Sequence, residues 1–183
     1  MAPRPLPTEY APYAQPDIDL VEGDDIVATL AAQRDMVLAL LGSVSEERAS
    51  FAYAPGKWSL KQVVGHLSDD ERIFAYRALC IARGDGRPLP GFDENEYMAA
   101  AGFESRTVAD LLAEYRTVRW ATLTLFASMP DEAWVRRGVV NAYEATPRGL
   151  AFHIAGHELH HVRVLRDKYL GEIATDDRDR RTD

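Results

Sequence analysis

Apolar residues recur along much of this chain every three or four positions, the spacing that places them on one face of a helix. The clearest stripe passes through Leu60, Val63, Val64 and Leu67 and continues to Ile81. No segment shows convincing two-residue alternation with hairpin turns, so strands are not expected. The pattern predicts four long amphipathic helices, over residues 22–41, 59–83, 108–129 and 146–170.

The expected helix ends carry residue types that start and stop helices. Ser59 and Thr146 stand at N-cap positions, where a side-chain oxygen accepts a backbone N–H, and Pro147 suits the first helical position. Gly84 and Gly171 follow the second and fourth helices, where glycine tolerates the backbone conformation that ends a helix. These signals support the boundaries that the apolar stripes indicate.

We therefore expect an all-α protein, with a four-helix bundle over residues 22–172. The long connection between the second and third helices, residues 85–106, allows a crossover such as an up-down-down-up topology, or a short extra helix. Residues 1–21 are rich in proline and are interpreted as an extended arm that lies on the bundle or is mobile. Residues 173–183 are interpreted as a charged C-terminal tail.

Composition and charge narrow the function classes. The 183 residues are 46% hydrophobic and 27% charged, as in an ordinary globular domain. A formal net charge of −8 argues against a nucleic-acid partner, since phosphate binding needs a concentrated positive surface. Cys80 is the single cysteine, which excludes an intrachain disulfide and a multi-cysteine zinc site. Without a long apolar run or a signal-peptide pattern, we expect a cytoplasmic protein with no membrane partner.

Ionisable residues interrupt the apolar stripe of the last expected helix. His157 and His161 are four residues apart and share a face, with His161 inside the stripe and His157 at its edge, and Glu158 also falls in the stripe. Such groups are costly in a core unless something satisfies them, and neutral imidazoles at this spacing can chelate a metal ion. Two hydrogen-bonded core histidines are the alternative. His153 and His160 lie on a stripe rotated away from the apolar face, so we expect them outside the site.

The second helix offers a third imidazole. His66 lies on the flank of its apolar stripe, Glu71 lies within the stripe, and Asp70 lies between them. A histidine from a neighbouring bundle helix can complete a three-histidine site that leaves positions open for water or substrate. The carboxylates could fix the imidazole tautomers, or could form a solvated acidic cluster. The sequence therefore predicts His66, His157 and His161 as the ligands of one divalent metal ion.

Residues 157–161 also match H-E-x-x-H, the zinc-protease signature, in which Glu158 would be the general base. Only 22 residues follow His161, which leaves little room for a subdomain with a third ligand. No sheet is expected whose edge strand could align a peptide substrate. This context argues against a metalloprotease.

Three segments in a particular order resemble the DinB/YfiT-like superfamily of helical-bundle metal proteins. They are residues 56–59 (Gly-Lys-Trp-Ser) followed by His66-Leu67 with Asp69 and Glu71, residues 146–149 (Thr-Pro-Arg-Gly), and residues 157–162 (His-Glu-Leu-His-His-Val). The resemblance covers residues 26–170, most of the chain. It implies a four-helix bundle and a metal triad of one histidine in the second helix and two, four apart, in the last. These positions are again His66, His157 and His161.

The resemblance also implies a kind of chemistry. Relatives include transferases that use low-molecular-weight thiols such as bacillithiol and mycothiol, so it implies a metal-dependent S-transferase with a thiol cosubstrate, and a homodimer. Three imidazoles accept several divalent ions, of which we expect zinc or nickel. A metal-stabilised binding or structural protein without catalysis is the alternative from another function class.

Glu71 and Glu158 are the candidate catalytic carboxylates. Each lies in an apolar stripe, where an idle carboxylate is costly. They could take a proton from a thiol or water bound to the ion, or could orient a ligand by hydrogen bonding.

Overall fold

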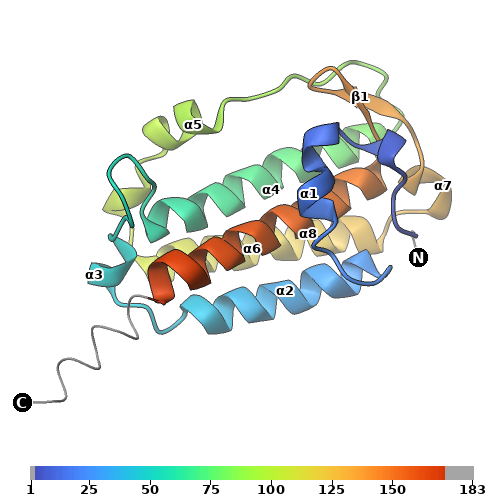
Figure 1. Ribbon diagram of the computed structural model, residues 1–183. Coiled ribbons are helices and arrows are strands. Elements are labelled where there is room, and N and C mark those ends of the chain that lie inside the picture. The colour runs from blue at the N-terminus through green and yellow to red at the C-terminus, as the bar shows by residue number, and fades with distance from the viewer. Residues whose placement is uncertain (1–2, 172–183) are drawn as a thin grey trace, which may run out of the picture.

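Residues 3–171 are described by the computed structural model, so the tail predicted at residues 173–183 lies outside the described part. Four long helices form a bundle (Figure 1): α2 (Ile26–Leu41), α4 (Leu60–Ala82), α6 (Val108–Ala127) and α8 (Pro147–Val164), with a π-helical turn η4 (Leu165–Leu170) continuing the last. The predicted all-α bundle is confirmed. In the described part of the chain, no helix is both long and apolar enough to cross a membrane.

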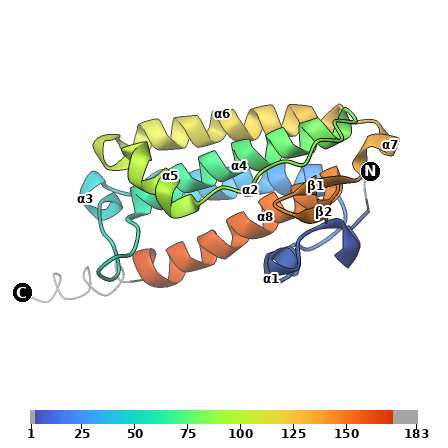
Figure 2. The ribbon, with the colours of Figure 1, turned by 90° about the horizontal axis from the view of Figure 1, so that it is seen from above.

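The four long helices run in an up-down-down-up arrangement. The colour gradient in Figure 1 shows α4 and α6 running in one direction and α2 and α8 in the other. α4 packs against α6 and α8, and α2 packs against the same two helices. The connection from α4 to α6 returns along the outside of α4 (Figure 2). α4 and α8 are therefore antiparallel neighbours, and residues far apart in the sequence face each other along their length.

The helix ends follow the predicted capping chemistry. Ser59 and Thr146 each accept a hydrogen bond from the backbone N–H three residues later, and Pro147 occupies the first turn of α8. α2 begins at Ile26 rather than at residue 22, because the side chain of Asp25 caps it.

The N-terminal segment, residues 3–21, lies against α8 (Figure 2). Its prolines begin short helical turns, η1 (Pro7–Glu9), η2 (Pro12–Ala14) and α1 (Gln15–Ile18), so the segment is not the extended arm that its proline content suggested. The approach is close: a Cβ at Gly149 or Gly156 would lie 2.2 Å from a backbone oxygen of this segment. A buried ion pair between Arg148 and Glu9 also holds it, with 2.7 Å between Nε and Oε2.

Short elements complete the fold, and those outside residues 85–106 were not expected from the sequence. The helical ones are α3 (Glu46–Ala49), α5 (Glu94–Ala101), η3 (Phe103–Ser105) and α7 (Asp131–Trp134). A hairpin of β1 (Gly138–Val140) and β2 (Tyr143–Ala145) precedes α8; its three-residue strands are too short to show alternation. Leu89 hydrogen-bonds to this hairpin, which fixes the start of the connection that carries α5.

Candidate metal centre

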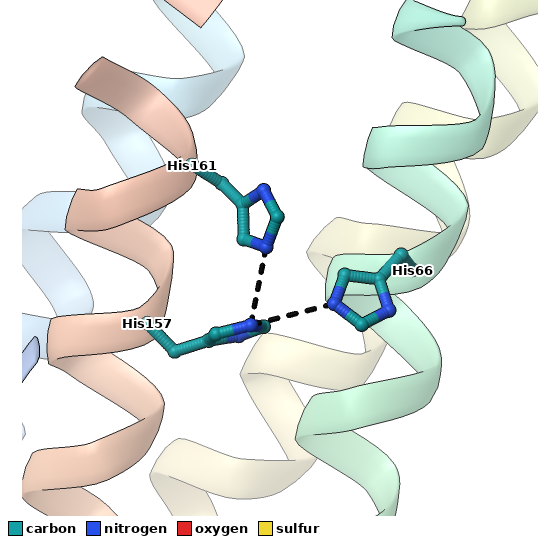
Figure 3. Close-up of side chains that lie close together, drawn as sticks. All are labelled: His66, His157 and His161. Carbon is teal, nitrogen blue, oxygen red and sulfur yellow. Dashed lines mark hydrogen bonds between the residues drawn. The ribbon is translucent and has the colours of Figure 1, made fainter. Parts of the chain in front are cut away.

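Three imidazole rings meet across the interface between α4 and α8. The Nε2 atom of His157 lies 3.4 Å from Nε2 of His66 and 3.1 Å from Nε2 of His161. Figure 3 shows His66 projecting from α4 toward the two rings of α8. One nitrogen of each ring lies within 4.8 Å of the others, a spacing that could hold one metal ion. We call these three residues the imidazole cluster.

Helix geometry explains why these rings meet. His157 and His161 are one turn apart on α8 and project from the same face. α4 runs antiparallel beside α8, so His66, near the start of α4, lies opposite the second half of α8. The structure thus brings together the three predicted ligands.

Asp70 and Trp58 support two of the rings from outside the cluster. Oδ2 of Asp70 lies 3.3 Å from Nδ1 of His157, which directs the Nε2 lone pair of a neutral His157 toward the other rings. The indole of Trp58 packs on His66, with 4.8 Å between ring centroids. Asp70 is thus positioned to fix the tautomer of His157, a role that the sequence indicated for the carboxylates of this helix.

The electrostatics of the cluster suit a cation. Burial and the neighbouring imidazole lower the pKa of His66 to about 4, and burial with three neighbouring histidines lowers the pKa of His161 to about 2, so both rings are neutral at physiological pH. Burial opposes the charged form of His157, but Asp70 outweighs it and raises the pKa of that ring. The single Nε2 lone pair of a neutral His157 cannot pair fully with both neighbouring rings. A cation between the rings can accept all three lone pairs, so the donor set fits a metal ion.

Glu71 and Glu158, the predicted catalytic carboxylates, lie in a different cluster. Nε of Arg119 donates to both oxygens of Glu71 at 2.9 Å, and Nη2 donates to Glu158 at 2.7 Å. The hydroxyl of Tyr115 donates to Glu158 at 2.6 Å. All four side chains are at most 2% exposed. We call this group the Arg119 cluster. Its hydrogen bonds explain how two carboxylates are stable in the core without a metal ion.

The other two histidines of α8 differ from each other. His160 is exposed, as expected, and lies 3.8 Å from Asp17. His153 is not on an outward face as predicted: it is 7% exposed and stacks on Phe74, with 4.3 Å between ring centroids. The N-terminal segment causes this difference, because Tyr13 packs edge-on against His153 and covers a face of α8 that the apolar stripe does not include.

Two hollows flank the imidazole cluster. One, of about 270 Å³, includes His161, Trp58 and Tyr169 in its lining; we call it the His161 hollow. The other, of about 280 Å³, includes His157 and His153; we call it the His157 hollow. Glu94, at the start of α5, lines both hollows. Ligands could therefore approach the cluster from two sides.

Some residues around the site were missed by sequence reasoning. Arg119 and Arg77 are buried cations whose helical spacing places each inside an apolar stripe, a signal that was available but unused. Glu94 had no such signal. It reaches the site because α5 packs back over α4, with Met98 in the core.

The fold and the facing imidazoles together define a helical bundle with the geometry of a metal site. Residues 29–165 match the DinB superfamily, and the chain belongs to that superfamily, as the sequence resemblance predicted.

One relative and one solved structure show how far the likeness extends. A protein of Geobacillus thermodenitrificans (strain NG80-2), named "Putative metal-dependent hydrolase", is 30% identical over 105 residues, which are 55% of this chain and 59% of that relative. The match thus spans about three fifths of the relative's length. The structure of YfiT from Bacillus subtilis, described as "a probable metal-dependent hydrolase with an unusual four-helix bundle topology", has a TM-score of 0.67 at 15% identity, over 90% of this chain and 93% of that one. At that identity the likeness establishes the fold alone.

Proposed function

We propose that this protein is a metal-dependent enzyme in which His66, His157 and His161 would hold a divalent ion that would supply the activation of a small nucleophile. The observation that carries the proposal is that three Nε2 atoms converge between two hollows. Catalytic metal sites combine three protein ligands with an open position, whereas structural sites are closed. A divalent ion supplies the Lewis acidity that lowers the pKa of a water or thiol.

We propose hydrolysis, with water as the nucleophile, as the reaction class. The names of the relative from Geobacillus and of YfiT support this choice. Transfer to a low-molecular-weight thiol is the second candidate. The observation that favours it is the pair of separate hollows, because a reaction of two organic substrates needs a place for each.

The residues of this chain have distinct proposed roles. Asp70 directs Nε2 of His157 toward the other two rings, and His66 and His161 stay neutral; an ion would take the place of a proton on Nε2 of His157. We assign proton acceptance from the nucleophile to Glu94, which lines both hollows and forms no ion pair with any described residue. Glu71 and Glu158 both form ion pairs with Arg119, so we assign them a structural role in stabilising the bundle.

The experiment is a metal-reconstitution assay on the full chain. Metal-free protein is loaded separately with zinc and with nickel, the two expected ions, and ion content per chain is measured. Each form is screened for hydrolysis of ester, amide and lactone substrates, and for conjugation of thiols to electrophiles. We expect turnover that needs the ion and is lost in His66→Ala, while His160→Ala, which changes an exposed histidine of α8, retains it. If the ion binds but neither the hydrolysis screen nor the thiol-conjugation screen shows turnover, the metal site is structural instead.

The homodimer implied by the sequence resemblance stays a prediction. Sedimentation at micromolar concentration tests it, and a species with the mass of one chain would contradict it.

A further inference from the structure

Three arginines are buried in the described part of the chain: Arg77, Arg119 and Arg148, at 4%, 1% and 9% exposure. Arg119 pairs with two glutamates, and Arg148 pairs with Glu9. Arg77 has no carboxylate partner among residues 3–171. Because arginine is seldom buried without such a partner, Arg77 requires a different explanation.

The contacts of Arg77 leave most of its hydrogen-bonding capacity unused. Nη2 donates to the carbonyl oxygen of Pro90 at 2.7 Å. The guanidinium also lies over the rings of Phe74 and Phe92, at 4.9 and 5.5 Å from their centroids. Aromatic faces attract a cation, but they do not offer oxygen acceptors to the five N–H groups of the guanidinium. The remaining donors are therefore available to an anionic group from outside the chain.

Arg77 lines the His157 hollow, next to the proposed metal site. Asp70, Phe74 and Arg77 follow one another on successive turns of α4. Arg77 lies seven residues beyond Asp70, which is roughly 10 Å along the helix axis. Asp70 contacts His157 and Arg77 lies further along α4, so Arg77 and His157 line different parts of the hollow.

Between Arg77 and His157, the lining of the hollow contains a second polar group with unused hydrogen-bonding capacity. His153, which stacks on Phe74, has a buried Nδ1 atom with no hydrogen-bond partner in the described part of the chain. The side chains of Phe74, Phe92 and Tyr13 are the aromatic part of its lining. The lining of the hollow thus combines a guanidinium, aromatic side chains and His157 of the imidazole cluster.

We propose that the His157 hollow binds a small aromatic or otherwise flat monocarboxylic acid, with Arg77 as the residue that recognises the carboxylate. The inference rests on the proposed function in one respect: the reacting bond of such a substrate lies at the imidazole cluster. Asp17, Asp70 and Glu94 also line this hollow, so a carboxylate is favoured only where the guanidinium of Arg77 pairs with it. Their negative charge disfavours a second anionic group, which limits the substrate to one carboxylate.

The first experiment measures binding to zinc-loaded full-length protein by calorimetry, with 3-phenylpropanoate, its uncharged amide and 3-phenylpropylamine as probes. We expect the carboxylate to bind roughly tenfold or more tightly than the amide, as a charge-assisted hydrogen bond predicts. Arg77→Met removes that difference. Arg83→Met, the same change at the exposed arginine that directly follows α4, leaves it intact. Equal carboxylate affinity in Arg77→Met, or tightest binding of the amine, overturns the proposal.

A second variant keeps the test decisive if Arg77→Met does not fold. Arg77→Lys retains the charge and the aliphatic stem but loses the planar fork. We expect it to lower carboxylate affinity several-fold and to leave amide affinity unchanged. Unchanged carboxylate affinity in folded Arg77→Lys overturns the assignment of the fork to carboxylate recognition.

The second experiment tells carboxylate binding at Arg77 from direct ligation of the ion. Cobalt-loaded protein, with zinc-loaded protein as the diamagnetic control, is titrated with the probe carrying a ¹³C-labelled carboxyl group. Paramagnetic relaxation is expected to place that carbon well beyond ligation distance from the ion, because Arg77 lies about 10 Å further along α4 than Asp70. A carboxylate that ligates the ion would place it within about 3 Å and would overturn the proposal.

These measurements need no turnover, so the two proposals can fail separately. Arg77-dependent carboxylate binding without metal-dependent turnover contradicts the enzymatic function and leaves the binding site established. If turnover depends on the metal but carboxylate affinity is the same with and without Arg77, only this inference is contradicted.

Discussion

The imidazole cluster, together with its supporting Asp70, and the Arg119 cluster use adjacent residues of α4 and α8, and α6 adds Tyr115 and Arg119 to the second cluster. His157 and Glu158 are neighbours on α8, and Asp70 and Glu71 are neighbours on α4. A helix turns about 100° per residue, so one member of each pair faces the flanking hollows and the other faces the bundle centre. In the centre, Arg119 satisfies both carboxylates. At the hollows, three imidazoles face one another and leave lone pairs for a ligand.

This difference separates a cluster that is satisfied within the chain from one that leaves room for a ligand. Both clusters place costly polar groups in a largely apolar interior. The Arg119 cluster is complete within the chain, because its hydrogen bonds pair the cation with two anions and extend to Tyr115. The imidazole cluster has only nitrogen donors and no internal cation. We therefore expect changes in the first cluster to affect folding, and changes in the second to affect ligand binding.

The largest expected effect is that of Arg119→Met. Removing the guanidinium leaves Glu71 and Glu158 as two buried carboxylates without a cation. Breaking a buried pair in this way costs about 3–5 kcal/mol of stability. Urea unfolding measures the loss, with Arg116→Met, at an exposed arginine of the same helix, as the control. A change in stability as small as that of the control would show that the cluster does not hold the bundle together.

Next in size is the response of stability to a metal ion. An ion that binds only the folded chain stabilises it by about 2.7 kcal/mol at 100 times its Kd. We expect His66→Ala, His157→Ala and His161→Ala each to abolish this gain and to lower the ion content sharply. His153→Ala and His160→Ala should change ion content much less. Melting curves with and without zinc measure the first effect, and elemental analysis measures the second. Loss of the ion in His160→Ala but not in His161→Ala would contradict the ligand assignment.

Glu158→Gln tests directly whether the two clusters are independent. Glutamine keeps the shape of the side chain but loses the charge that pairs with Arg119. We expect a loss of stability of about 1–3 kcal/mol, with zinc affinity unchanged. Glu71→Gln should behave in the same way. If either variant retains its stability but loses turnover while the ion stays bound, that carboxylate is the catalytic base, as the sequence alone suggested.

The smallest expected effect is that of Asp70→Asn, which acts through His157. Loss of an outer-shell partner of a metal ligand typically weakens metal affinity about 10–100-fold without abolishing binding. Zinc titration against a competing chelator measures this change. Asp69→Asn, at the adjacent and more exposed carboxylate, is the matched control. Equal affinities in the two variants would mean that Asp70 does not orient the ring.

Helical spacing made much of the site accessible from the sequence, because residues four apart on a helix must share a face. Spacing alone also allows the pair His153 and His157, but the position of His161 inside the apolar stripe favours His157 with His161. His66 follows once a neighbouring helix is invoked. The same reasoning could not assign Glu71 and Glu158, because an apolar stripe shows only that a residue points inward. Whether an inward carboxylate meets an ion or an arginine depends on the opposite helix, and here α6 supplies Arg119.

The sequence by itself determined the four helices, their caps, the bundle class and the three histidines, because these depend on local chemistry and on a period of 3.6 residues. Only the tertiary structure decided which carboxylates serve the imidazoles, why His153 is buried, and which residues line the two hollows. Those outcomes depend on segments that pack across the bundle from elsewhere in the chain: Tyr13 of the N-terminal segment, Glu94 of α5, and Arg119 of α6. Periodicity along one helix carries no information about what covers its other face.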